Sequence, residues 1–249
     1  MSIQLRFVRR LREAENAESF YFQSESPLHF QAGQFLHYTL PLSESDNRGS
    51  ARSFTIASAP SEPLVRLTTR MGEPPSSFKH ALAQLVPGNV VEANGPYGQF
   101  VYHHVDRPAV FIAGGIGITP FRAMLGDLAA SPRVAGITLL YSNSTADIAF
   151  RTFLDSVAAA WPRVRVVYTV TRPDLTWRGP TGRIDKRFIQ HHVPEADAKR
   201  AMFYVCGPTG FVQAMHGLLA DMGVESSRIR EEGFPGYEPA VRPSALVGS

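Results

Sequence analysis

The chain has 249 residues, of which 44% are hydrophobic and 19% are charged, enough for one large or two modest globular domains. Its single cysteine, Cys206, excludes a disulfide framework, a cysteine-ligated zinc site and a built-in iron–sulfur cluster, because each of these needs several thiolates. The formal net charge is only +3, and no basic run with interleaved aromatic residues suggests nucleic acid binding.

The N-terminal stretch carries charges throughout, whereas a signal peptide needs an apolar core, and no uninterrupted apolar run approaches the length of a membrane span. We therefore expect a cytoplasmic protein without a membrane span. Nearly all of the basic residues are arginines. Arginines scattered over a solvated surface are the simpler interpretation, and a basic face that docks an acidic partner is the alternative.

The first hundred residues consist of short alternating segments broken by turn residues, which predicts antiparallel strands and a small β-barrel. The segments are 3–11, 18–24, 34–42, 52–59, 65–71 and 89–101. One helix is predicted over 76–85, because serines suited to capping precede a face formed by Phe78, Ala81, Leu82 and Leu85.

After residue 108 the pattern changes to strands alternating with longer helices, which predicts an α/β domain with a doubly wound parallel sheet. The expected strands are 109–113, 136–142, 164–170, 201–205 and 228–232, and the expected helices are 120–130, 147–160, 185–192 and 208–222. The predicted organisation is thus a barrel domain over 1–105, an α/β domain over 106–237 and a C-terminal tail over 238–249.

A glycine-rich turn joins the first strand and helix of the α/β domain. It contains Gly114, Gly115 and Gly117, and such a turn lets the backbone approach a pyrophosphate held at the helix N-terminus. Pro120 stands where the fingerprint GxGxxG has its third glycine. Turns between buried strands and helices also use glycine for steric reasons alone, so this motif needs support from others.

The segment Tyr204 to Pro208 ends the fourth predicted parallel strand and leads into a helix. Because the carboxyl ends of such strands line the ligand crevice, Cys206 is expected at the mouth of that crevice, beside Gly207. A buried cysteine acting as a small hydrophobic residue is the alternative.

Residues 52–55 combine three kinds of group that suit a flavin. Arg52 has a fork of donors for a diphosphate, Phe54 can lie against a flat ring, and the Thr55 hydroxyl can donate to a ring nitrogen. Strand alternation puts Arg52 and Phe54 on one face and Ser53 and Thr55 on the other, so one ligand must straddle the strand edge. An ordinary strand explains the same residues.

Two further segments are candidates. Gly72, Ser76 and Ser77 precede or begin the barrel helix, whose N-terminus can receive a phosphate, with simple capping as the alternative. The segment Glu231 to Phe234 places a carboxylate and an aromatic ring after the last strand, and a solvated edge explains these charges equally well.

The motifs RSFT, GGIGITP, YVCGP and EGF occur in this order and at separations that resemble the ferredoxin–NADP reductase superfamily, over roughly residues 3 to 237. The resemblance implies a Greek-key β-barrel that binds FAD or FMN, followed by an α/β domain that binds NADH or NADPH. FAD is favoured over FMN.

For the flavin, the resemblance implies that Arg52 holds the phosphates, Phe54 packs on the ring and Thr55 lies near N5. Phe54 replaces the family's usual tyrosine, so the stacking surface remains but a phenolic hydrogen bond is lost. The other implied flavin contacts are Ser53, Thr68, Thr69, Arg70, Gly72, Ser76, Ser77 and Phe234.

For the nicotinamide nucleotide, the resemblance implies that Thr119 lies at the nicotinamide end, that Cys206 shapes the slot for the ring and that Glu232 lies near it. The other implied contacts are Gly114, Gly115, Gly117, Pro120, Ser142, Asn143, Arg172, Arg183, Gly207 and Pro208. Arg172 and Arg183 are placed as in some NADPH-dependent relatives, but Ser144 stands where many relatives carry arginine, so NADH is slightly favoured.

The function implied is hydride transfer from the nicotinamide to flavin N5, followed by single-electron transfer to a ferredoxin, an oxygenase component or another iron–sulfur or heme protein. Thr55, Cys206 and Glu232 are the residues expected at the reaction centre. A free-flavin reductase and a non-catalytic subunit that senses redox state or nucleotide are the alternatives.

Histidine does not indicate a metal site. The pairs His103–His104 and His191–His192 consist of adjacent residues, whose side chains diverge on a strand or helix. The sequence also lacks the GxSxG and HExxH motifs that indicate hydrolysis. We expect no bound metal.

Overall fold

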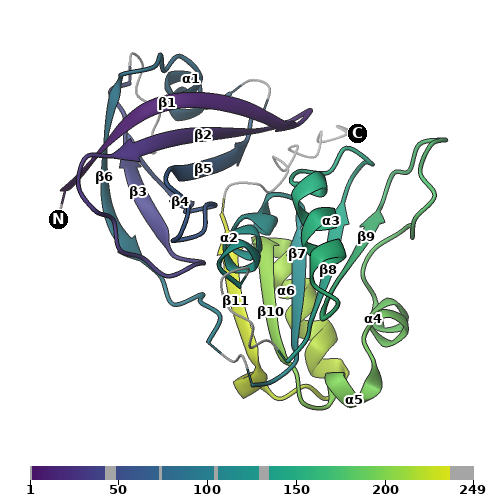
Figure 1. The fold of residues 1–249 in the computed structure, drawn as a ribbon. Coiled ribbons are helices and arrows are strands. Elements are labelled where there is room, and N and C mark those ends of the chain that lie inside the picture. The colour runs from purple at the N-terminus through teal and green to yellow at the C-terminus, as the bar shows by residue number, and fades with distance from the viewer. Residues whose placement is uncertain (1, 43–48, 73–74, 104–105, 129–134, 236–249) are drawn as a thin grey trace, which may run out of the picture.

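A computed structural model describes residues 2–42, 49–72, 75–103, 106–128 and 135–235. Figure 1 shows a curled sheet at the upper left and a parallel sheet covered by helices at the lower right. The curled sheet has the strand order β4-β3-β6-β1-β2-β5. Its strands are β1 (Ser2–Ala14), β2 (Ala17–Ser24), β3 (Phe35–Thr39), β4 (Ala51–Thr55), β5 (Val65–Arg70) and β6 (Val90–Tyr97).

All strand pairs in this first sheet are antiparallel, as predicted. A bridge between Ile56 and Leu67 brings the two edges of the sheet together, so the sheet curls into a half-barrel. Helix α1 (Ser77–Ala83) buries Phe78 and Leu82 against the barrel core. The predicted helix is therefore confirmed, although it is shorter than 76–85.

The second sheet is entirely parallel and has the strand order β11-β10-β7-β8-β9. Its strands are β7 (Ala109–Gly114), β8 (Ile137–Asn143), β9 (Val164–Val170), β10 (Met202–Pro208) and β11 (Ile229–Phe234). The chain winds away from β7 in both directions, which confirms the predicted doubly wound sheet. The switch between β7 and β10 is where such sheets open a ligand crevice.

Helices cover both faces of the parallel sheet. Buried residues of α2 and α3 pack on one face, and those of α4 and α6 pack on the other. The helices are α2 (Thr119–Leu128), α3 (Arg151–Ala160), α4 (Lys186–His192), α5 (Glu195–Ala198) and α6 (Thr209–Asp221), with 3-10 turns η1 (Gly115–Ile118) and η2 (Ser226–Arg228).

Several element bounds differ from the sequence prediction, and two of the differences have a local cause. Helix α3 begins at Arg151 rather than 147, because the buried Phe150 adopts a left-handed conformation with φ of 62° and interrupts the helical path. The short segments η1, α5 and η2 were not predicted, because three or four residues are too few to show a helical period.

The two halves share one hydrophobic cluster. Ala17, Ala57 and Phe100 from the barrel half belong to the same buried cluster as Phe111 and Phe121 of the second half. The domain boundary expected at 105 and 106 touches residues 104–105, and both these residues and the tail 238–249 lie outside the described part. Within the described part, no helix is long and apolar enough to cross a membrane.

Candidate functional site

A cavity of about 600 Å³ lies between the half-barrel and the carboxyl end of the parallel sheet. All of the residues from Ala51 to Thr55 line it, so it wraps around the free edge of β4, as the strand alternation predicted. The other lining residues are Phe35, His37, Thr68, Ser76, Phe78, Lys79, Ile116, Thr119, Glu232, Gly233, Phe234 and Pro235. A volume of this size is typical of a cofactor site.

Arg52 and Phe54 form one side of this cavity. The Arg52 Nη1 atom donates to the carbonyl oxygens of Gly49 at 2.7 Å and Ala51 at 2.8 Å, and its guanidinium lies 5.6 Å from the Phe78 ring. The Phe54 ring lies 5.6 Å from the same ring. Arg52 and Phe54 therefore present a cation and an aromatic surface on the same side of the cavity.

Thr55 contributes a hydroxyl to the wall of the main cavity. Its side chain is 4% exposed, and its Oγ1 atom is buried without a hydrogen bond to any residue in the described ranges. Buried polar atoms are nearly always hydrogen-bonded, so an unsatisfied one in a cavity wall suits a ligand atom. By contrast, the Thr68 hydroxyl in the same wall is already bonded to Ser19 at 2.7 Å.

The other barrel residues expected at a flavin separate into two groups. Ser76 lines the cavity, and its hydroxyl caps α1 by accepting from the Lys79 amide at 3.4 Å. Gly72, Ser77 and the buried Thr69 do not line it. The structure thus brings only part of the α1 segment to this cavity.

The glycines of the turn after β7 have different roles. A Cβ atom at Gly117 would lie 2.3 Å from the Cys206 carbonyl oxygen, and one at Gly114 would lie 2.8 Å from the Phe211 ring. These two glycines are therefore required for packing against β10 and α6. Gly115 has a φ of +53° and open space around its Cβ position, so it is the glycine that a ligand can approach.

Thr119, at the start of α2, also lines the main cavity, while its hydroxyl donates to the Ile116 carbonyl at 3.1 Å. Its neighbour Pro120 is buried and does not line the cavity. The main cavity thus has walls from both halves of the chain.

A second, smaller cavity of about 110 Å³ brings together Gly115, Asn143 and Arg172, three of the residues that the resemblance implies for the nucleotide. It also contains Ser144, whose carbonyl oxygen accepts from the Arg172 amide at 2.9 Å. Arg70 lies here and not in the main cavity, because β5 ends at this side of the barrel. The remaining lining residues are Ala14 to Ala17, Ile116, Tyr141, Thr145, Asp147 and Ala149.

Ser142, Arg183, Gly207 and Pro208 line neither cavity. Arg183 is exposed, and Gly207 packs against Phe211, to which its Cβ position is only 2.8 Å distant. The structure therefore does not bring these four expected residues to either cavity surface.

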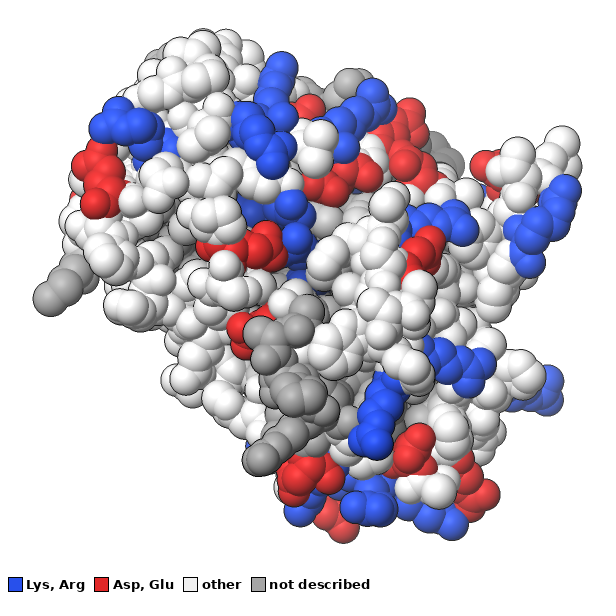
Figure 2. All heavy atoms as spheres, in the orientation of Figure 1, with Lys and Arg blue, Asp and Glu red and all other residues white. Residues whose placement is uncertain are grey.

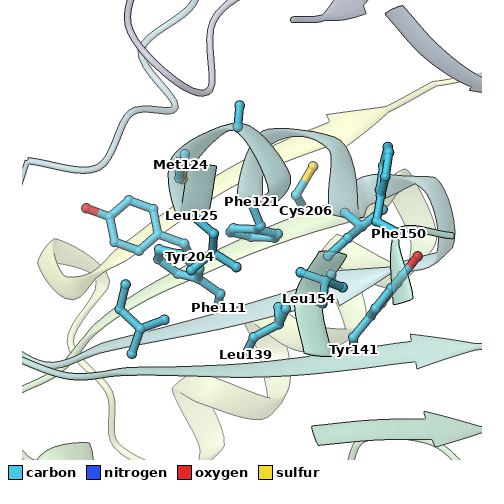
Figure 3. Close-up of a cluster of buried hydrophobic side chains, with 14 of the residues drawn as sticks. Phe111, Phe121, Met124, Leu125, Leu139, Tyr141, Phe150, Leu154, Tyr204 and Cys206 are labelled. Carbon is cyan, nitrogen blue, oxygen red and sulfur yellow. The ribbon is translucent and has the colours of Figure 1, made fainter. Parts of the chain in front are cut away.

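Cys206 is placed differently from the prediction. Its backbone is near the carboxyl end of β10, as expected, but its side chain is 0% exposed and lies beside Phe121 in the hydrophobic cluster (Figure 3). It is absent from the linings of both cavities. Burial, with a smaller effect from Glu232, raises the pKa of the Cys206 thiol well above its ordinary value. The thiol is therefore not at the mouth of the crevice, because η1 and α2 cover it.

Glu232 does line the main cavity. Burial raises the pKa of its carboxyl to about 7, and its Oε2 atom is buried without a hydrogen-bond partner among the residues described. The adjacent Glu231 instead bonds His216 at 2.7 Å. Glu232 is thus the carboxyl of this pair that is available to a ligand.

Sequence reasoning missed several cavity residues. The His37 Nδ1 atom is 2.7 Å from the Ser53 hydroxyl, and the Phe35 ring packs 5.3 Å from His37. These residues alternate along β3 opposite residues 53 and 55, so pairing β3 with β4 would have predicted their place. Lys79, one turn after Ser76, could have been found from the helix period.

Charge is mixed over the face in Figure 2, where Lys and Arg side chains are interspersed with Asp and Glu. This face fits the simpler interpretation of scattered, solvated arginines. In the described ranges, no group of three or more His, Cys, Asp or Glu side chains is arranged to hold a metal ion.

Known proteins resemble this chain in sequence. Residues 111–217 match the family described as oxidoreductase NAD-binding domain. The chain is 30% identical over 243 residues to the stachydrine N-demethylase reductase subunit Stc4 of Rhizobium meliloti (strain 1021), covering 94% of this chain and 67% of that protein. It is 29% identical over 217 residues to the phenol hydroxylase P5 protein of Acinetobacter pittii (strain PHEA-2), covering 85% and 60%. The chain thus spans about two thirds or less of the length of these two relatives.

Solved structures share the fold. The flavohem-like FAD/NAD-binding domain of nitric oxide dioxygenase from Vibrio cholerae O1 biovar El Tor superposes with a TM-score of 0.83 at 23% identity, covering 94% of this chain and 99% of that one. The ferredoxin reductase in carbazole 1,9a-dioxygenase gives a TM-score of 0.78 at 20% identity, covering 94% and 69%. The arrangement of the half-barrel before the parallel sheet is therefore shared with these proteins.

Proposed function

This chain belongs to the ferredoxin–NADP reductase superfamily, and from that premise we propose that it is a flavoprotein reductase that moves a hydride from NADH or NADPH to a bound FAD and electrons from there to a separate acceptor protein. When bound, the flavin would supply the conversion between two-electron and one-electron chemistry. The residues of the chain bind and orient the two ligands.

The observation that carries this proposal is the Thr55 hydroxyl in the wall of the main cavity, which has no hydrogen-bond partner among the described residues. A flat ring with hydrogen-bonding nitrogens fits a site that combines such a hydroxyl with the Phe54 ring. Arg52 and Lys79 line the same cavity and suit a diphosphate. Because FAD carries a diphosphate and FMN a single phosphate, these two cations favour FAD over FMN in this proposal.

Within this proposal four of the cavity residues act on the flavin ring. Phe54 and Phe234 cover the ring, and Thr55 donates to its central nitrogen. Glu232 holds a proton near neutral pH, because burial raises its pKa to about 7, and a neutral carboxyl avoids placing a negative charge beside an electron-rich ring.

The second cavity is the proposed site for the nicotinamide nucleotide. Gly115 allows the backbone to approach the pyrophosphate, while Arg70 and Arg172 supply cationic donors from the two halves of the chain. Thr119 in the main cavity marks the nicotinamide end. Ser144 supplies no cation for a 2′-phosphate, so we favour NADH as the donor.

For the acceptor we propose an oxygenase component, a ferredoxin or another iron–sulfur or heme protein. This rests on the relatives, one of which is named as the reductase subunit of a demethylase and another as the phenol hydroxylase P5 protein. The single cysteine cannot hold an iron–sulfur cluster within this chain.

A visible spectrum of the purified protein, followed by anaerobic titration with NADH and with NADPH, tests the proposal. We expect a bound flavin spectrum that bleaches on addition of a nucleotide. A protein that stays colourless and takes up neither FAD nor FMN would contradict it.

Measurements on the same preparation distinguish the proposed function from two alternatives, a free-flavin reductase and a non-catalytic sensor. A free-flavin reductase would lose its flavin during purification yet reduce added flavin with multiple turnovers. A non-catalytic sensor would bind nucleotide but show negligible NAD(P)H oxidation with ferricyanide.

A further inference from the structure

Arg122 of helix α2 reaches from the α/β half of the chain to the barrel half. Its side chain is only 7% exposed, and its Nη1 atom donates to the Ala57 carbonyl at 3.1 Å and to the Glu62 carboxylate. Ala57 and Glu62 belong to the segment between β4 and β5. One buried guanidinium therefore holds two points of the barrel.

Neighbouring groups hold the bridge formed by Arg122, Ala57 and Glu62 in place. The Arg122 guanidinium lies 4.5 Å from the Phe153 ring of α3, and the bridging Glu62 oxygen also accepts from the Ala59 amide at 3.0 Å. At Gly126, the next turn of α2, a Cβ atom would lie 3.1 Å from the Ala59 side chain. Helix α2 and the barrel segment are thus in close contact at Gly126 as well as at the ion pair.

Separating these groups is unfavourable. Moving the two halves apart at this point would leave a buried guanidinium without its carboxylate, and buried charges are tolerated only when they are paired. Exposed ion pairs of the same chain, such as Arg6 with Glu25, do not have this constraint because both side chains are about half exposed to water.

The bridge is close along the chain to both walls of the main cavity. Ala57 follows Thr55 by two residues in the barrel, and Arg122 follows Thr119 by three residues at the start of α2. Thr55 and Thr119 both line the main cavity. The bridge therefore links the two segments whose side chains approach the cavity from opposite halves of the chain.

We propose that Arg122 is a positioning residue that fixes the separation between the flavin and the nicotinamide through its bonds to Ala57 and Glu62. This inference rests on the proposed function. In the reaction concerned, a hydride leaves the nicotinamide with both electrons of its C–H bond, so the nucleotide is oxidised and the flavin is reduced. Arg122 touches neither ligand, and it acts by holding Thr55 and Thr119 at a fixed distance from each other.

Displacements of about 1 Å can slow a transfer of this kind by about 100-fold. Arg122→Lys keeps the charge, but its ammonium nitrogen lies one bond closer to the backbone than Nη1, the atom that makes both bonds. It also lacks the planar guanidinium that lies over the Phe153 ring. Glu62→Gln keeps the shape and removes the charge. Arg6→Lys, on the exposed pair with Glu25, is the matched control.

The experiment is anaerobic stopped-flow reduction of the flavin-loaded protein with a saturating excess of whichever nucleotide reduces the wild type faster. For Arg122→Lys we expect a fall of about 10- to 100-fold in the limiting rate. We also expect a weaker long-wavelength charge-transfer absorbance and a larger isotope effect with 4-deuterated nucleotide. The flavin and nucleotide dissociation constants should stay unchanged, the Glu62→Gln rate should be intermediate, and Arg6→Lys should match the wild type.

A limiting rate equal to that of the wild type in folded Arg122→Lys and Glu62→Gln would overturn the inference, as would a loss of ligand affinity that accounts for the whole effect. If Arg122→Lys does not fold, the limiting rate of Glu62→Gln is the test. A fall in that rate supports the inference, and a rate equal to that of the wild type overturns it. A wild type that neither nucleotide reduces would overturn the proposed function first, and this inference with it.

Discussion

Cys206 and Glu232 are partners in the parallel register of β10 and β11, so their side chains leave the same face of the sheet. Their surroundings differ because β11 is the edge strand. Cys206 is enclosed by the hydrophobic cluster, whereas Glu232 reaches the main cavity. Burial raises the pKa of both side chains, which keeps both in their neutral forms over a wider range of pH than usual.

The first prediction concerns the reactivity of Cys206. A thiol that is 0% exposed, with a pKa well above the ordinary value, forms little thiolate and is sheltered from reagents. We expect the native protein to resist labelling by a thiol reagent at pH 8 and to take up one equivalent after unfolding, since the chain has one cysteine. Fast stoichiometric labelling of the native protein would show that the thiol is accessible.

The second prediction concerns Glu232 in the flavin-free protein. A carboxyl whose pKa rises from 4.5 to about 7 on folding binds more protons in the folded state between these values. Its contribution to stability is present below pH 4.5 and is lost as the pH rises through about 7. Glu232→Gln should therefore raise the free energy of unfolding at pH 8 relative to the wild type and leave it little changed at pH 4.

The size of the Glu232 pKa shift sets an upper limit on this change in the free energy of unfolding. For a rise from 4.5 to about 7, at about 1.4 kcal/mol per pKa unit, the effect is at most about 3.5 kcal/mol, and partial exposure reduces it to about 1–2 kcal/mol. Urea unfolding at the two pH values measures it. Glu231→Gln is the control, and equal effects of the two substitutions would argue against a special role for burial at Glu232.

The third prediction concerns the unpartnered hydroxyl of Thr55. Thr55→Val removes a hydroxyl that has no hydrogen bond in the described structure, so the flavin-free protein should be as stable as the wild type or more stable by about 1 kcal/mol. If the hydroxyl donates to the flavin, the rate of flavin reduction should fall about tenfold. Thr55→Ser should retain the wild-type rate, and a Thr55→Val rate equal to it would exclude this hydrogen bond.

The sequence predicted best where a motif lies within one element. Residues 52–55 are consecutive on β4, and because alternation puts them on two faces, they share the main cavity only since β4 is an edge strand. Glycine motifs are recognised in the same way, but which glycine serves packing and which faces open space depends on β10 and α6, which are distant in sequence.

Features that depend on long-range packing could not be predicted from local pattern. The second cavity contains Arg70 because the barrel strand β5 ends against the parallel sheet. The burial of Cys206 depends on how η1 and α2 cover β10. The bridge from Arg122 joins residues about sixty positions apart, and no periodicity within either segment indicates the other.

The fourth prediction concerns the choice of nucleotide. Ser144 and Arg172 lie together in the second cavity, joined by a backbone hydrogen bond of 2.9 Å. Ser144→Arg adds a third cation to Arg70 and Arg172 there, so we expect kcat/KM for NADPH to rise about tenfold while the value for NADH changes little. Ser144→Gln, of similar length but uncharged, should give no such rise. A strong preference of the wild type for NADPH would contradict the inference that Ser144 favours NADH.

The fifth prediction separates the glycines of the turn after β7. A Cβ atom at Gly117 would overlap the Cys206 carbonyl at 2.3 Å, and backbone cannot yield as a flexible side chain does. Gly117→Ala should therefore lower the free energy of unfolding by about 3 kcal/mol or prevent folding. Gly115→Ala meets no atom within 4 Å, so it should cost only about 1 kcal/mol for the left-handed φ of +53°.

Gly115→Ala, the less destabilising of these two substitutions, is the one that we expect to weaken nucleotide binding. Gly115 faces the second cavity, so a methyl group there should weaken nucleotide affinity although the protein stays folded. Gly217→Ala, on the exposed face of α6 with nothing within 4 Å, is the control and should stabilise the protein by about 1 kcal/mol. Denaturant unfolding and nucleotide titration of the three variants measure both effects. Equal nucleotide affinity in Gly115→Ala and Gly217→Ala would show that the turn does not bind the nucleotide at Gly115.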